Sequence, residues 1–157
     1  NWNRGRMDLA PHPFTTSFGY GDVRITTRYL ETDGMSSLFS TMHEAGHALY
    51  DQGLDPKYRN TSLGRATSLA VHESQSRFWE NLIGRSEAFW QFAFPIVQML
   101  FPEHLANISM EQFYRGINRV EPSLIRIEAD EATYNLHIML RFEIETGLME
   151  GLSLIHI

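Results

Sequence analysis

The sequence predicts a mainly α protein with a small β element near its N-terminus. Residues 22–30, DVRITTRYL, alternate in polarity and are rich in β-branched side chains, which is typical of a strand. From residue 36 onward, apolar residues recur at helical spacing between capping and stop signals. The chain of 157 residues is 43% hydrophobic and 20% charged, which is typical of a globular domain with a real core.

The first two helices of this pattern have clear boundaries. Ser36 or Ser37 supplies the side-chain oxygen that caps a helix running to about Gln52, and Gly53 then stops it. A second helix is expected over residues 66–83, and Gly84 ends it.

Two further helices follow along the chain. Ser86 is the expected cap of the third helix, EAFWQFAFPIVQML, and Pro95 should kink or break it because proline lacks the N–H of the helical ladder. Ser109 and Gln112 form a capping-box pattern for the fourth helix, over about residues 110–119.

A long fifth helix is expected towards the C-terminal end. Pro122 suits its first turn, since proline is favoured at the first helical position, and the pattern reaches about Leu148. The apolar residues of this segment fall mostly on one stripe, as an amphipathic helix requires: Leu124, Ile127, Leu136, Met139, Leu140 and Ile144.

Charge and composition argue against several classes of partner. The formal net charge of -6 disfavours nucleic acid and anionic membrane surfaces. No apolar run approaches the roughly 18 residues of a membrane span. The chain has no cysteine, so disulfides and thiolate metal sites are excluded, and a reducing, cytoplasmic location is expected.

The stretch STMHEAGHALYDQG, residues 40–53, carries the strongest chemical signal. His43 and His47 are four residues apart, so on a helix they share a face and can bind one metal ion. Glu44 lies about 100° around the helix from His43 and borders that face. A glutamate in this place takes a proton from water that the metal has acidified, as in a zinc hydrolase. The alternative is a helix that carries two histidines without binding metal.

A catalytic zinc needs three protein ligands and one open position. Glu73 lies on the next expected helix and is the best third ligand, although it can also be an exposed helix carboxylate. His72 is adjacent to it but points about 100° away. Asp51 follows His47 by four residues and is expected to accept the other ring N–H of a metal-bound histidine; otherwise it belongs to the helix C-terminus.

Five motifs occur in a specific order. They are HPF at residues 12–14, DVRIT at 22–26, HEAGH at 43–47, HESQ at 72–75 and IRIEAD at 125–130. With this set the chain resembles the carboxypeptidase Taq family of thermostable metallocarboxypeptidases over nearly all of residues 4–150. HEXXH alone is shared by many peptidase families, whereas this ordered set is highly specific.

The resemblance implies a helical zincin-like fold similar to neurolysin and angiotensin-converting enzyme, with a deep groove that holds the metal. It implies zinc, for which cobalt can substitute, on His43, His47 and Glu73, with Glu44 as the catalytic base. It also implies the release of single residues from peptide C-termini with broad specificity, by a homodimer. The substrates would be peptides with a free C-terminal carboxylate.

A carboxypeptidase needs a fixed cation for that carboxylate, and arginine suits it because its guanidinium binds a carboxylate through two hydrogen bonds. Arg126 in IRIEAD is the first candidate, with a structural ion pair to Asp130 as the alternative. Arg24 in DVRIT is the second, with a cross-strand ion pair as the alternative.

Because the chain is much shorter than the family's members, more than one function remains possible. Family members are about three times longer, so residues 1–150 are expected to be the metal-binding part of one larger catalytic domain. Residues 151–157 are expected to be a tail, suspected to be non-native. An endopeptidase or dipeptidase on the same scaffold remains open, as does a non-catalytic metal-binding module.

Overall fold

The structure, a computed structural model, describes residues 1–151, apart from the side chain of Glu128. The tail expected at residues 151–157 lies, from residue 152 onward, outside the described part. The chain divides into two compact units, Asn1–Met110 and Glu111–Ile157. None of the described helices combines the length and the apolar character that a membrane crossing needs.

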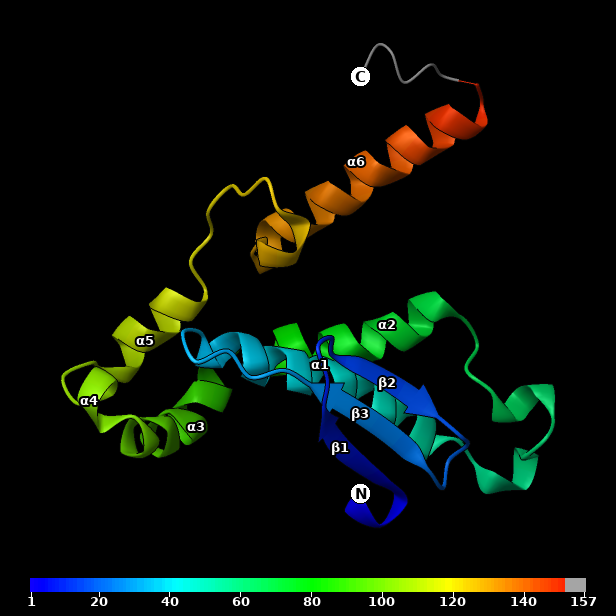
Figure 1. Ribbon diagram of the computed structural model, residues 1–157, viewed down its shortest axis with the longest axis horizontal. Coiled ribbons are helices and arrows are strands. Elements are labelled where there is room, and N and C mark those ends of the chain that lie inside the picture. Colours follow the sequence, from blue (N-terminus) through cyan, green and yellow to red (C-terminus); the bar gives the residue numbers. More distant parts are fainter. Residues whose placement is uncertain (152–157) are drawn as a thin grey trace. The chain divides into compact units, whose positions relative to one another are not determined.

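The first unit opens with a three-stranded sheet (Figure 1). Its strands are β1, Gly5–Leu9, β2, Phe14–Ser17, and β3, Val23–Thr27. The middle strand β3 runs parallel to β1 and antiparallel to β2. The expected strand at 22–30 is therefore confirmed but shorter, and it gains two neighbours that the sequence pattern did not indicate. Alternate β3 residues are buried: Val23, Ile25 and Thr27.

Helix α1, Gly34–Gly53, carries the HEAGH motif. It ends at Gly53 as predicted, but the predicted cap is wrong. Asp33 caps the helix, because its side chain accepts a hydrogen bond from the N–H of Ser36 at 2.9 Å. The hydroxyl of Ser37 instead donates to the carbonyl of Arg28 at 2.8 Å and ties the helix to the preceding loop.

Helix α2, Leu69–Arg77, carries Glu73 and begins later than the predicted residue 66. Its cap is Ser68, whose hydroxyl accepts from the N–H of Val71 at 3.2 Å. The helix continues as a π-helical turn, η4, Phe78–Ile83, so the predicted segment is helical to its end but not uniformly α-helical. Wide turns of this kind are frequent at functional sites.

Helix α3, Glu87–Leu100, is capped by Ser86 as predicted, since its hydroxyl accepts from the N–H of Phe89 at 3.2 Å. It runs through Pro95 without ending, so a break there is wrong. Burial of Trp90, Ala93 and Phe94 on this helix offsets the loss of one ladder bond. The short α4, Pro102–Leu105, follows in the first unit, and α5, Met110–Ile117, lies at the start of the second unit.

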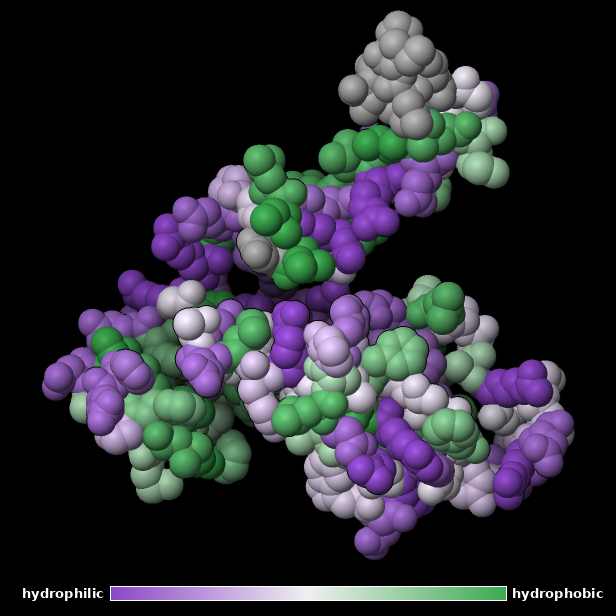
Figure 2. All heavy atoms as spheres, in the orientation of Figure 1, coloured by the Kyte–Doolittle hydropathy of each residue, from purple (hydrophilic) through white to green (hydrophobic). Residues whose placement is uncertain are grey.

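The second unit corrects the predicted long helix. Helix α6 spans Glu131–Met149 and is capped by Asp130, which accepts from the N–H groups of Ala132 and Thr133 at 2.9 Å each. Pro122 lies in the irregular segment before it, which includes the 3₁₀ turn η5, Arg126–Glu128. Apolar and hydrophilic residues both lie on the visible surface of α6 (Figure 2), and the exposed apolar ones include Leu136, Met139 and Phe142.

Helix α1 lies between the sheet and α2 (Figure 1). On one face, the hydroxyl of Thr41 is 2.8 Å from that of Thr27 on β3. On the opposite face, Gly46 meets the backbone of α2 at Ser76. The core of this unit consists of Val23, Ile25, Phe39, Trp90, Ala93 and Phe94. The HEAGH helix is therefore fixed from two sides within this chain.

Candidate metal centre

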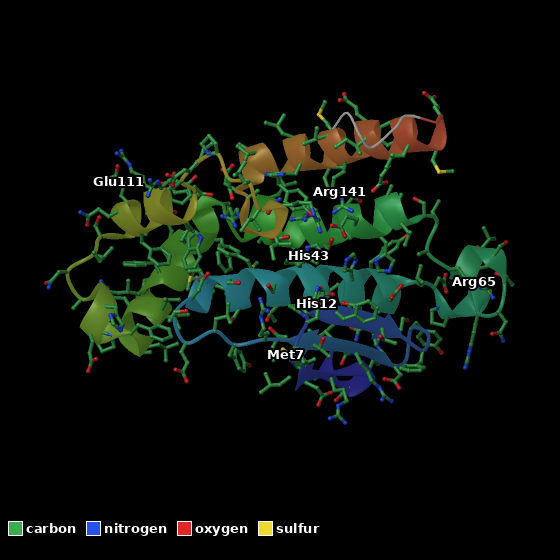
Figure 3. The ribbon with its side chains drawn as sticks, turned by 45° about the horizontal axis from the view of Figure 1, so that its top comes forward. Met7, His12, His43, Arg65, Glu111 and Arg141 are labelled. Carbon is green, nitrogen blue, oxygen red and sulfur yellow. The ribbon has the colours of Figure 1, made fainter. Side chains whose placement is uncertain are left out.

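His43 lies on α1 (Figure 3). His43 and His47 both contact the carboxylate of Glu73 on α2. The Nε2 atom of His43 is 3.5 Å from Oε2 of Glu73, and Nε2 of His47 is 3.3 Å from the same oxygen. One ligand atom from each residue lies within 4.8 Å of the others. The three residues that the sequence nominated as ligands thus converge on one point.

The geometry suits a tetrahedral metal ion. Metal–ligand bonds of about 2.0–2.1 Å at tetrahedral angles place ligand atoms about 3.3 Å apart. The two nitrogen–oxygen separations, 3.5 and 3.3 Å, match that edge length, and the third edge, between the two imidazole nitrogens, lies within 4.8 Å. Two imidazoles and a carboxylate also form a donor set that zinc accepts, and three protein ligands leave a fourth position open. The residues present therefore fit the group.

A close approach of two backbones makes this convergence feasible. A Cβ atom on Gly46 would lie 2.6 Å from the carbonyl oxygen of Gln75 and 2.6 Å from Cα of Ser76. Only glycine allows α1 and α2 to come this near. Glu73 precedes the contact by less than one turn, so its carboxylate reaches the histidine pair.

The three groups also shift one another's protonation. Burial lowers the pKa of His43, but its hydrogen bonds to Glu73 and Glu80 outweigh burial and raise the pKa to about 9. Burial raises the pKa of Glu73, but its contacts with His43 and His47 outweigh burial and hold the pKa well below its ordinary value. Without metal, a proton therefore occupies the place that a cation would take.

Glu44 lies on the sheet side of the site and is buried. Its Oε2 accepts a hydrogen bond from the hydroxyl of Thr15 at 2.5 Å, and the same hydroxyl is 3.1 Å from the backbone carbonyl of Glu44. Because Thr15 belongs to the edge strand β2, this hydrogen bond ties the Glu44 carboxylate to the sheet. The sequence did not indicate Thr15, because β2 itself was not expected.

A family model described as "Carboxypeptidase Taq (M32) metallopeptidase" matches residues 1–155. The chain belongs to this family. The description "metallopeptidase" implies a metal ion in this family. The candidate site for that ion in this chain is the cluster of His43, His47 and Glu73.

Named relatives agree with the assignment of the chain to this family. Thermostable carboxypeptidase 1 of Thermus thermophilus is 54% identical over 147 residues, which cover 94% of this chain and 29% of that protein. Carboxypeptidase 1 of Bacillus subtilis is 46% identical over 151 residues, covering 96% and 30%. The crystal structure of an M32 carboxypeptidase from Deinococcus radiodurans superposes with a TM-score of 0.94 at 52% identity, covering 99% and 31%. The chain thus spans about a third of its relatives' length, and their mainly helical fold is confirmed for it.

In both histidines, the ring nitrogen that faces away from Glu73 has a hydrogen-bond partner. Neither partner was predicted from the sequence. Nδ1 of His43 is 2.7 Å from Oε2 of Glu80, a residue not singled out in the sequence. Nδ1 of His47 faces Nδ1 of His72 at 2.6 Å. Asp51, expected beside His47, instead contacts Nε2 of His72 at 3.1 Å. Its carboxylate therefore reaches His47 only through the ring of His72.

The two candidate arginines are held differently. Nε and Nη2 of Arg24 donate to the carboxylate of Asp22, at 3.0 and 2.7 Å, where the middle strand β3 begins. Arg24 also lies on the face of β3 opposite the buried residues that pack on α1. Arg126 belongs to the second unit and donates to the hydroxyl of Tyr134 at 2.6 Å. The alternative partner, Asp130, serves as the cap of α6.

Proposed function

We propose that the protein carrying this chain is a zinc-dependent metallocarboxypeptidase that releases single residues from peptide C-termini with broad specificity. The observation that carries the proposal is the convergence of His43, His47 and Glu73 beside Glu44, in a chain of the carboxypeptidase Taq family. Zinc is the proposed ion because two imidazoles and one carboxylate form its usual hydrolytic ligand set, and cobalt is expected to substitute.

The ion would supply acidity to a bound water and polarisation to the scissile carbonyl. The proposed role of Glu44 is to accept a proton from that water and to pass it to the leaving amine. Its hydrogen bond from Thr15 holds one carboxylate oxygen and so fixes the direction of the other. The proposed role of Glu73 is to hold the ion together with both histidines.

Recognition of the free C-terminus is assigned to an arginine, first to Arg126 and second to Arg24. Arg126 donates to a phenol hydroxyl and not to a carboxylate, so its charge is available to a substrate carboxylate at little electrostatic cost. Arg24 would have to leave its two-point pair with Asp22. Replacing the functional arginine by lysine is expected to raise KM for free-acid peptides and to leave KM for C-terminal amides unchanged.

Elemental analysis of the purified protein tests the ligand set. Wild type and Glu44→Gln are expected to hold about one zinc per chain, because Glu44 is a base and not a ligand. Glu73→Ala is expected to hold little. Full metal content in Glu73→Ala would overturn the third ligand, and loss of metal in Glu44→Gln would overturn the separation of roles.

Peptide cleavage tests the reaction class and uses the full-length protein. The proposal predicts that a chelator abolishes release of C-terminal residues, that zinc restores it, and that a peptide ending in an amide is a poor substrate. Equal cleavage of both peptides would favour an endopeptidase, and release of dipeptides would favour a dipeptidase. No cleavage with zinc bound would favour a non-catalytic metal module.

Assembly and location complete the proposal. A homodimer in the cytoplasm rests on the family resemblance and on the cysteine-free sequence. Light scattering of the full-length protein tests the dimer, and a monomer at micromolar concentration would contradict it.

A further inference from the structure

A continuous hydrogen-bonded chain leads away from His47 on the side opposite to the candidate ligand atom. Nδ1 of His47 lies 2.6 Å from Nδ1 of His72, and Nε2 of His72 lies 3.1 Å from Oδ1 of Asp51. All three side chains are largely buried, with 16%, 18% and 12% of their surfaces exposed. The ring of Tyr50 packs edge-on against His72 with 5.0 Å between centroids. His72 is thus held from two sides.

For neutral rings, only one proton assignment satisfies this chain. The carboxylate of Asp51 can only accept, so Nε2 of His72 must carry a hydrogen. Nδ1 of the neutral His72 ring is then an acceptor, and Nδ1 of His47 must donate to it. The remaining nitrogen of His47, Nε2, consequently keeps its lone pair. That is the nitrogen which lies 3.3 Å from Glu73.

The imidazole of His43 is held by a shorter arrangement. Nδ1 of His43 donates to Oε2 of Glu80 at 2.7 Å, and the same oxygen accepts from Arg77 at 2.9 Å. Arg77 also donates to Oε1 of Glu73 at 3.2 Å, which leaves Oε2 of Glu73 towards the histidines. One histidine is therefore backed directly by a carboxylate, whereas the other is backed by a second imidazole.

We propose that His72 is a positioning residue that fixes the ring orientation and the tautomer of His47 for metal binding, with Asp51 fixing His72 in turn. The inference rests on the proposed metal site. His72 does not compete as a ligand, because its Nδ1 points at Nδ1 of His47 and its Nε2 is engaged by Asp51. Residues in this position orient ligands and raise their basicity, and replacing them typically weakens metal binding by about 10–100-fold.

Two variants at one position separate positioning from bulk packing. His72→Phe keeps a ring of similar size beside Tyr50 but removes both nitrogens. His72→Asn keeps an oxygen near the place of Nδ1 as an acceptor for His47 and loses the link to Asp51. Zinc affinity is measured by competition with a chromophoric chelator, and the visible spectrum of the cobalt form reports the ligand field.

The expected result is about 10–100-fold weaker zinc binding in His72→Phe, with an altered cobalt spectrum and unchanged far-ultraviolet circular dichroism. His72→Asn should bind more tightly than His72→Phe. Zinc affinity and a cobalt spectrum like those of wild type in His72→Phe would overturn the inference. Glu73→Ala, run in parallel, distinguishes this failure from failure of the site itself, because zinc binding unaffected by Glu73→Ala would overturn the proposed ligand set.

A measurement on the unaltered protein keeps the inference testable if His72→Phe fails to fold. Nitrogen-15 spectra of the histidine side chains in the zinc-loaded protein report which ring nitrogen carries hydrogen. His72 is expected as the Nε2–H tautomer and His47 with hydrogen on Nδ1. A His72 ring with hydrogen on Nδ1 alone would overturn the inference.

Discussion

Helices α1 and α6 are nearly equal in length, 20 and 19 residues, but their surroundings differ completely. Helix α1 packs against the sheet on one face and against α2 on the other, and it buries Phe39 and Glu44. In α6, whose residues are all described, none is buried. Most helical stability in proteins comes from such packing and not from propensity. The helix that carries the chemistry is therefore the one whose position is determined within this chain.

Matched phenylalanine substitutions should show the largest difference between the two helices. Phe39 in α1 is 6% exposed and lies under the guanidinium of Arg85, 4.2 Å from the ring centroid. Phe142 in α6 is 70% exposed. We expect Phe39→Ala to lower the free energy of unfolding by about 3–5 kcal/mol, because it leaves a cavity in the core. Phe142→Ala should stay within about 0.5 kcal/mol.

Urea unfolding followed by circular dichroism measures both variants beside wild type. If Phe142→Ala costs as much as Phe39→Ala, α6 is packed as firmly as α1 and the contrast between the helices fails.

Matched glycine substitutions within α1 should sharpen the contrast on a smaller scale. Gly46→Ala places a methyl group 2.6 Å from the backbone of α2, so the helices must separate. Overpacking of this kind costs about 1–3 kcal/mol and should also move Glu73 away from the histidines, with loss of zinc. Gly53→Ala meets nothing within 4 Å and is expected to be neutral or to stabilise the helix by up to about 1 kcal/mol.

Thermal unfolding and zinc content of the two glycine variants are the measurements. Retention of one zinc per chain in Gly46→Ala would show that the close approach is not required for the site.

The HEAGH helix could be predicted from the sequence because local spacing decides it, whereas Glu73 was predicted from the need for a third ligand on the next helix. His43 and His47 share a face whatever α1 packs against. Glu80 could also have been predicted to lie near the site, since it follows Glu73 by seven residues and Arg77 by three, on the same side of one helix. The hydrogen bond between His47 and His72 could not be predicted from the sequence, because it depends on how helices α1 and α2 cross.

Two features of the fold were hidden for different physical reasons. Strands β1 and β2 are short and mostly exposed, so they carry no clear alternation; their pairing with β3 makes them strands. The start of α6 was misplaced because Pro122 and Asp130 both signal a helix start. The helix starts at Asp130 because its side chain accepts hydrogen bonds from two helix N–H groups. A proline is tolerated in the first turn but adds no hydrogen bond there.

A pH titration of the metal-free protein probes α1 through the His43–Glu73 pair. The raised pKa of His43 adds stability that is full below its ordinary value of 6.5 and is lost as the pH rises through about 9. The lowered pKa of Glu73 adds stability that is full above its ordinary value of 4.5 and is lost as the pH falls. The contribution of the pair should therefore be greatest between pH 4.5 and 6.5.

Urea midpoints with a chelator present, at pH 6 and pH 9, measure this effect. Glu73→Gln should flatten the decline relative to wild type, because the pKa of His43 then rises less. An equal decline in both proteins would mean that the pair does not carry the pH dependence.

The smallest effect is expected at the cap of α6, and it tests whether that helix depends on local interactions alone. Oδ1 of Asp130 accepts from two helix N–H groups, and Oδ2 accepts from the N–H of Glu121 and the hydroxyl of Thr133. Asp130→Ala removes all four contacts, so the first turn of α6 should unwind and the helical signal should fall slightly. Asp130→Asn keeps an oxygen for the cap and should retain most of that signal. Hydrogen exchange of the amides of residues 131–134 measures the local effect, which should leave the amides of α1 unchanged. Faster exchange in α1 would contradict the prediction that the loss of the cap acts only on the first turn of α6.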